Sequence, residues 1–118
     1  MIVKQRDIFL VPFPYSDLSG QKVRPVLVLS NDRFNTSGED AIVCSITSNR
    51  TKGPFAINIS HENLSEGVLY APCQVKVESV LKLDKKMFIK KIGVLKKEVF
   101  SDVLRVFHSI FELIPKLL

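Results

Sequence analysis

The chain is poor in cysteine and lacks any long apolar run. Its two cysteines, Cys44 and Cys73, lie in strand-like apolar segments, and neither has a nearby Cys or His at metal-site spacing. We expect two small buried residues rather than a disulfide, which needs an oxidising compartment. No apolar run reaches the roughly 18 residues that cross a bilayer, and the N-terminal MIVKQRD lacks the apolar segment of a secretory signal. These absences predict a cytoplasmic chain with no membrane partner.

Several catalytic motifs are also missing. The sequence contains no glycine-rich phosphate loop, no HExxH and no GxSxG. Its two histidines, His61 and His108, are far apart, and neither has a partner at catalytic or metal spacing. We therefore expect neither triad chemistry nor hydrolysis at a bound metal, and we predict no cofactor and no metal ligands.

What is present is the composition of one basic globular domain, residues 1–118. Hydrophobic residues make up 46% of the chain and charged residues 25%, which is typical of a soluble protein with a substantial core. The formal net charge is +5, from 17 basic and 12 acidic residues. This balance suits an anionic partner, either nucleic acid or an acidic protein.

Short apolar segments bounded by turn residues predict a sheet-rich fold. Strands are expected at 7–13, 23–30, 40–48, 54–59, 68–77 and 88–94, and the fourth is expected to pair back on the third as a hairpin. Polar connections are expected at 15–22, 31–39 and 60–67, and a helical turn capped by Asp84 at 82–87. Pro12 and Pro14 indicate a sheet edge or a strand end. Strands followed by one helix indicate a small curled antiparallel sheet or barrel.

The one long helix is expected at residues 96–114. Its apolar residues have the spacing of a single buried stripe, which comprises Val99, Phe100, Val103, Leu104, Phe107, Ile110, Phe111 and Ile114. Pro115 is expected to end this helix. The stripe fits packing onto the sheet and a subunit interface equally well.

The segment DLSGQKVRPVLVLSND, from Asp17 to Asp32, contains the first candidate site residue. Its apolar run, residues 26–29, is typical of a strand buried on both faces. Pro25 has no N–H and favours an extended conformation for Arg24, which is therefore held at the mouth of this strand. A guanidinium there suits a bound anion, and an ordinary surface arginine at a strand end fits the same pattern.

A second group of candidates follows the strand at 40–48. Alternation puts Ala41, Val43, Ser45 and Thr47 on one face of that strand and Ile42, Cys44 and Ile46 on the other. Thr47 and Ser48 precede a basic turn that contains Arg50 and Lys52. A hydroxyl there can donate to a phosphate oxygen, although a threonine at a strand end is commonly structural. If this strand and the preceding strand end at the same side of the sheet, Arg24, Arg50 and Lys52 form a positive rim. Such a rim suits the oxygens of a phosphate group.

Several blocks of the sequence resemble the MazF/PemK (PemK-like) toxins of prokaryotic toxin–antitoxin modules. RDIFLVPFPYSDLSG followed by KVRPVLVLSND is similar to the opening of that family, and AIVCSITS is similar to its strand ending in Ile-Thr. Gln74-Val75, the Leu-Asp-Lys segment at 83–85 and a C-terminal helix follow in the same order, so the similarity spans residues 5–113. The resemblance implies an SH3-like small β-barrel, mainly β with a C-terminal α-helix, that works as a homodimer.

The same resemblance implies an endoribonuclease that cleaves single-stranded RNA, often mRNA, at short sequences without a metal, by attack of the ribose 2′-OH. Its partner is an acidic antitoxin protein. The catalytic arginine of the family falls on Arg24 and its catalytic threonine on Thr47. The loop at 15–22 matches one that orders around RNA and is displaced by antitoxin. With the basic rim, the predicted RNA-binding set is Ser19, Gly20, Lys22, Ser48, Arg50, Lys52, Gln74 and Lys76.

Two observations argue against assigning the ribonuclease activity of the family to this chain directly. Lys76 lies where many members carry arginine, so the charge is kept but the planar fork of donors is lost. The fold also has a branch, resembling CcdB, that poisons DNA gyrase and does not cut RNA. That branch is the alternative reading, and the presence of Arg24 and Thr47 favours the nuclease.

Overall fold

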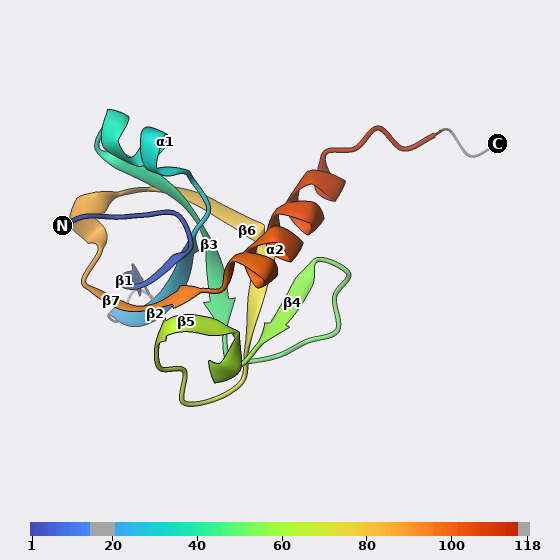
Figure 1. Cartoon of the computed structure of the whole chain (residues 1–118), viewed down its shortest axis with the longest axis horizontal. Helices are drawn as coiled ribbons and strands as arrows, with labels where there is room; N and C mark the ends of the chain where they lie inside the picture. Colours follow the sequence, from blue (N-terminus) through green and yellow to red (C-terminus); the bar gives the residue numbers. More distant parts are fainter. Residues whose placement is uncertain (15–20, 116–118) are drawn as a thin grey trace.

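A computed structural model of the chain describes residues 1–14 and 21–115 (Figure 1). The described strands form one antiparallel sheet in the order β4-β6-β3-β2-β1-β7-β5, and the sheet curls into a half-barrel. The strands are β1 (Asp7–Pro14), β2 (Gln21–Val28), β3 (Asp40–Thr47), β4 (Ala56–Ile59), β5 (Leu64–Gly67), β6 (Cys73–Asp84) and β7 (Lys90–Leu95). The helices are α1 (Asp32–Ser37) and α2 (Lys97–Ile110), with 3₁₀ turns η1 (His61–Asn63) and η2 (Lys85–Met87). This confirms the predicted fold class.

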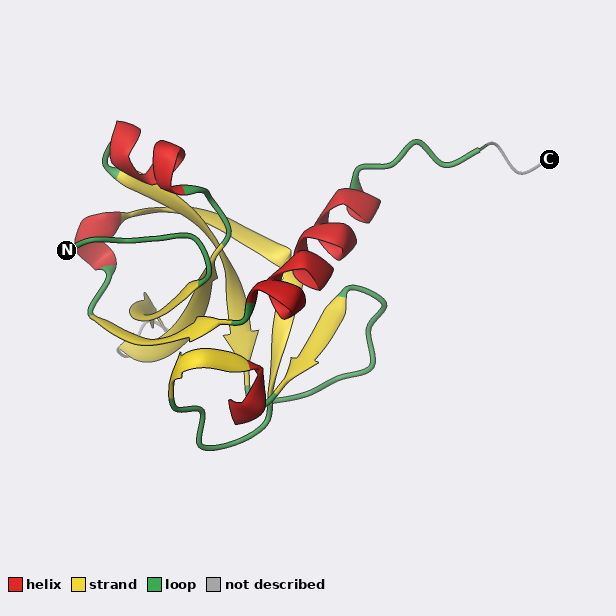
Figure 2. Cartoon of the chain, in the orientation of Figure 1, coloured by secondary structure: helices red, strands yellow, loops and turns green. Residues whose placement is uncertain are grey.

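Both faces of the sheet are buried at its centre. One face contributes to a cluster inside the curl, where the rings of Phe9 and Phe88 lie edge to face with centroids 5.0 Å apart. The other face packs against α2, which lies across it beside β6 (Figure 2). Phe100 and Val103 are the buried residues of α2. The apolar stripe of the helix therefore belongs to the core as far as Ile110.

Several predictions from local pattern are confirmed. The residues of β3 alternate as expected, because Ala41 and Val43 join the cluster inside the curl and Cys44 and Ile46 join the cluster under α2. Asp84 caps η2 by accepting a hydrogen bond from the backbone N–H of Lys86 (2.8 Å). Both cysteines are buried, as expected, and both are free.

In the described part of the chain, neither helix is long and apolar enough to cross a membrane.

The predicted hairpin between the third and fourth strands is wrong. β4 pairs with β6, and β6 lies between β4 and β3. The 12-residue β6 pairs with β3 along most of its length, so β4 can reach only the opposite edge of β6. Residues 68–72 were expected to be strand, but β6 begins after Pro72, which cannot donate to a ladder.

Two predicted loops contain regular structure. The segment 31–39 forms α1, because Asn31 caps it by accepting the N–H of Phe34 (2.9 Å). The segment 60–67 forms η1 and β5, and β5 pairs with β7. β2 begins at Gln21, so only residues 15–20 of the predicted loop at 15–22 lie outside the described structure. The polar composition of these segments therefore predicted loops where the structure has a short capped helix and a short edge strand.

The proline prediction is confirmed, because β1 ends at Pro14. β7 pairs with β1 only as far as Leu10, so among the described strands β2 alone pairs with the segment that contains Pro12 and Pro14. The helix-end prediction needs a small correction. α2 ends at Ile110, four residues earlier than expected. Phe111 and Ile114 are exposed and are not part of the buried stripe.

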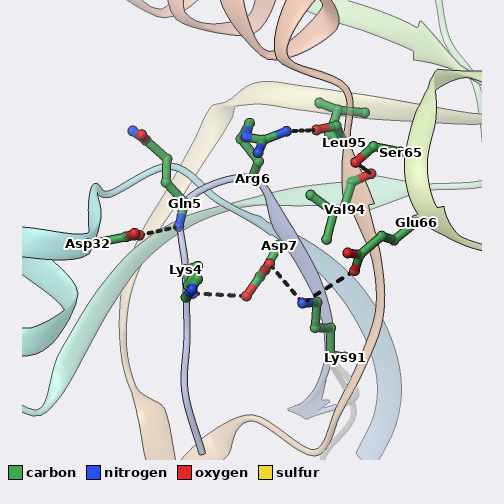
Figure 3. Close-up of polar contacts among 10 residues, drawn as sticks. All are labelled: Lys4, Gln5, Arg6, Asp7, Asp32, Ser65, Glu66, Lys91, Val94 and Leu95. Atoms are coloured by element: carbon green, nitrogen blue, oxygen red, sulfur yellow. Dashed lines mark hydrogen bonds and ion pairs between the residues drawn. The ribbon is translucent and has the colours of Figure 1, made fainter.

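A tight turn at Arg6 precedes β1, and contacts around this turn connect the start of β1 to β7 and β5 (Figure 3). Arg6 has a φ of 78°, in the left-handed region that residues other than glycine rarely adopt. Its carbonyl oxygen accepts the N–H of Leu95 (2.9 Å), and its Nη1 donates to the Leu95 carbonyl oxygen (2.8 Å). The buried carboxylate of Asp7 lies 3.4 Å from Nζ of Lys91, which also lies 3.7 Å from Glu66. These contacts fasten the start of β1 to β7 and β5.

Candidate functional site

A row of polar side chains crosses four neighbouring strands on one face of the sheet. Thr47 of β3 is paired with Gln74 of β6, and Gln74 is paired with Asn58 of β4. Directly paired residues of antiparallel strands project to the same side. Continuing the β2–β3 register by two residues beyond Val26 and Ser45 sets Arg24 level with Thr47. The row is therefore Arg24, Thr47, Gln74 and Asn58.

Arg24 is exposed at the point where β2 separates from β3. The paired residues of these strands end at Val26 and Ser45, because the next residue of β2, Pro25, has no N–H to donate. On its other side β2 stays paired with β1, where Arg24 faces Val11. Arg24 is thus carried by a strand held on one side, just before the buried run at 26–29, as the Arg-Pro pattern predicts.

The hydroxyl of Thr47 is oriented by its own strand end. Its Oγ1 accepts the backbone N–H of Asn49 (3.1 Å). Within the described residues the hydroxyl hydrogen has no acceptor, and a threonine hydroxyl has one hydrogen to donate. Thr47 can therefore donate to a bound oxygen atom on the same face as Arg24.

Gln74 is buried and fastens the basic turn to the sheet. Its Oε1 accepts the N–H of Thr51 (3.1 Å), and its Nε2 donates to the Thr51 carbonyl oxygen (2.6 Å) and to Oδ1 of Asn58 (3.1 Å). Both of its donor hydrogens are used within the protein. Gln74 thus holds the segment that carries Arg50 and Lys52 beside the row.

Two adjoining hollows lie along this segment. Their volumes are about 470 and 490 Å³, and both are lined by Thr51, Lys52, Asn58 and Gln74. Arg50 and Ser48 also line the smaller one. Two of the predicted rim cations, Arg50 and Lys52, thus line an open depression next to Gln74, whereas Arg24 lines neither hollow. The open shape suits an extended anionic ligand better than an enclosed small molecule.

The other predicted site residues lie at the margins of this face. Lys76 is half-buried, pairs with Ser45 and lies two residues along β6 from Gln74. Lys22 is exposed on β2, two residues before Arg24 and therefore on the same face. Ser19 and Gly20 lie outside the described residues.

The thiols and histidines contribute no nucleophile to this face. Burial raises the pKa of the Cys44 thiol to about 12. Burial also raises the pKa of the Cys73 thiol, and the positive charge of Arg50 lowers it in part. Both thiols therefore stay protonated at neutral pH and are poor nucleophiles. His61 on η1 and His108 on α2 are exposed and are not members of the row, and the described residues contain no cluster of metal-ligating side chains.

Asn58 and Thr51 are the residues of this site that the sequence did not indicate. Asn58 lies in the middle of a strand whose partner was predicted wrongly, so its neighbours could not be inferred. Thr51 takes part through its backbone, which carries no side-chain signal. The polar residue in the apolar run AINI was the one available hint.

Comparison with known proteins finds a family model that matches most of the chain. A family model, described as the PemK-like, MazF-like toxin of type II toxin–antitoxin systems, matches residues 4–111. No curated protein matches the chain.

Solved structures with similar folds include toxins alone and with antitoxins. A MazE–MazF structure from Deinococcus radiodurans has a TM-score of 0.76 and 18% identity, covering 94% of this chain and 96% of that one. An endoribonuclease in complex with its cognate antitoxin, from a mycobacterial species, has a TM-score of 0.75 and 14% identity, covering 92% and 94%. The Mycobacterium tuberculosis toxin MazF-mt6 has a TM-score of 0.73 and 19% identity, covering 90% and 96%. At these identities the likeness shows a shared fold.

Proposed function

The chain belongs to the family of PemK-like, MazF-like toxins of type II toxin–antitoxin systems, and from this membership we propose that it is an endoribonuclease. Its substrate is single-stranded RNA in the cytoplasm, cut at short sequences. The proposal is supported by the β2–β3 register, which sets Arg24 level with Thr47 when it is continued by two residues beyond the last pair. It is also supported by the basic depression that Ser48, the residue after Thr47, lines together with Arg50 and Lys52. A phosphodiester bound there meets a guanidinium and a hydroxyl from the same side.

In the proposed reaction the ribose 2′-oxygen attacks the neighbouring phosphorus. The bond from phosphorus to the 5′-oxygen breaks, which leaves a 2′,3′-cyclic phosphate and a 5′-hydroxyl. The nucleophile belongs to the substrate and is already held close to its target, so no metal is needed to supply it. The 2′-hydroxyl gives up a proton, and the 5′-oxygen takes one up.

Arg24 and Thr47 act on the charge that develops at phosphorus. The rigid fork of donors on Arg24 suits two phosphoryl oxygens at once. Thr47 donates a hydrogen bond to a non-bridging oxygen. Since a guanidinium that stays protonated is a poor base, Arg24 acts first as a charge stabiliser and second as a proton donor to the leaving oxygen.

The direct test is incubation of the purified protein with a long single-stranded RNA in the presence of a chelator, followed by mapping of the ends. We expect fragments with 2′,3′-cyclic phosphate and 5′-hydroxyl ends. Single-stranded DNA of the same sequence should stay intact, because it lacks the 2′-OH. Intact RNA, together with trapped complexes of gyrase and cleaved DNA, would instead favour the gyrase-poisoning alternative.

Replacing Thr47 with valine should lower kcat for RNA cleavage by about 100-fold, because one donor to the transition state is removed. The substitution keeps the shape of the side chain and leaves only the exposed N–H of Asn49 without its partner. Thr47→Ser keeps the hydroxyl and should stay within a few fold of wild type. A valine variant as active as the serine variant would remove the hydroxyl from the mechanism.

Two protein partners complete the proposal. An acidic antitoxin is supported by the net charge of +5 and by the exposed Arg50 and Lys52. A homodimer is supported by exposed apolar side chains after α2, since Phe111, Leu113 and Ile114 are 70%, 99% and 76% exposed.

A further inference from the structure

The hydrogen bonds around Gln74 determine what the neighbouring Asn58 offers to a ligand. The backbone of Thr51 contributes one donor, its N–H, and one acceptor, its carbonyl oxygen, and neither role can be exchanged. Oε1 of Gln74 must therefore face the Thr51 N–H, and Nε2 must face the Thr51 carbonyl oxygen. The orientation of the Gln74 amide, which is otherwise ambiguous for this residue type, is set by these two bonds.

The same reasoning sets the orientation of the Asn58 side-chain amide. The second hydrogen on Nε2 of Gln74 points to Asn58 and needs an acceptor, which Oδ1 of Asn58 supplies at 3.1 Å. The reverse orientation of Asn58 would bring two NH₂ groups together. Nδ2 of Asn58 is therefore turned away from Gln74, and no described residue accepts its two hydrogens.

Asn58 is exposed and lines both hollows beside the basic turn. It presents donors to the groove, while its oxygen is engaged by Gln74. Adenine is usually bound by asparagine through the oxygen and the nitrogen together, and here the oxygen faces away. A keto oxygen on a base accepts a hydrogen bond from Nδ2 of Asn58. An exocyclic amino group instead places its own N–H donors opposite those of Nδ2, so that no hydrogen bond forms between them.

We propose that Asn58 forms a base subsite that selects a keto base, uracil or guanine, over an amino base in the RNA groove. Gln74 acts as its positioning residue, and Arg50 and Lys52 neutralise the adjoining phosphates. Two strand spacings, about 10 Å, separate Asn58 from Thr47. The base that is read thus lies close to the bond to be cut. The inference rests on the proposed function and adds the class of base to it.

Uracil and cytosine are a clean pair of probes, because uracil carries a keto oxygen at position 4 and cytosine an amino group. Single-stranded octamers of deoxyuridine and of deoxycytidine also lack the 2′-OH, so their binding is measured without cleavage. Wild-type protein should bind the deoxyuridine octamer about tenfold more tightly, the effect of one hydrogen bond gained against one donor left unpaired. Fluorescence anisotropy measures both dissociation constants.

Asn58→Asp should reverse this preference, because the carboxylate still accepts from Gln74 and now turns an acceptor toward the base. Asn49→Asp is the matched control, since it adds the same charge near Thr47 outside the Gln74–Asn58 chain, and it should weaken both octamers by the same factor. Equal wild-type affinities, binding of neither octamer, or a preference that Asn58→Asp leaves unchanged would each overturn the subsite. Cleavage of long RNA by wild-type protein decides the proposed function separately.

Discussion

Replacing Arg24 with alanine is expected to reduce RNA cleavage by at least about 1,000-fold while the protein stays folded. A preorganised donor aimed at developing charge contributes two to three orders of magnitude to kcat in the mutational record of enzymes, and a phosphoryl-stabilising arginine contributes more. Arg24 is exposed, so its removal should leave the unfolding transition nearly unchanged. Single-turnover cleavage with denaturant unfolding measures both quantities.

Two further variants separate charge from geometry. Arg24→Lys keeps the positive charge and loses the planar fork, so it should recover only part of the lost rate. Arg33→Ala removes the same charge from the exposed face of α1, and it should cleave at close to the wild-type rate. Should Arg24→Ala cut RNA as fast as Arg33→Ala, the site is elsewhere and the mechanism proposed above fails.

The second large effect is on stability. Gly67→Ala should lower the free energy of unfolding by about 3 kcal/mol, the sum of backbone strain and overpacking. Gly67 has a φ of 86°, and a Cβ there would lie 2.1 Å from the carbonyl oxygen of Ile92 and 2.5 Å from Cα of Gly93. Both obstacles are backbone atoms of β7, which cannot turn aside as a flexible side chain can. The midpoint of urea unfolding reports the change.

Gly38→Ala is the control for that substitution. Gly38 has an extended backbone, with φ at −161°, and among the described residues, its two chain neighbours aside, no atom lies within 4 Å of the position its Cβ would take. Alanine there should leave the stability unchanged or raise it slightly, because the unfolded chain loses freedom. If both variants unfold at the same denaturant concentration, the close approach of β5 to β7 does not constrain the native state.

The sequence by itself determined the features that depend on near neighbours along the chain. Alternation in 40–48 assigned the two faces of β3, and with them the face that carries Thr47. Asp84 marked the cap of η2. Pro25 placed Arg24 in an extended conformation just before the buried run at 26–29. Each of these follows from local sterics or from period-two patterning, which operate over a few residues.

The tertiary structure decided which strands lie side by side. β4 follows β3 in the chain, but β6 lies between them, because the order of strands depends on which long apolar surfaces cover each other. Gln74 and Asn58 are 16 residues apart and meet only through that order. Arg24 and Thr47 could thus be proposed as a catalytic pair from local sequence and resemblance. The donor-presenting Asn58 became visible only in the tertiary structure, where β6 separates two strands that the sequence predicts to pair directly.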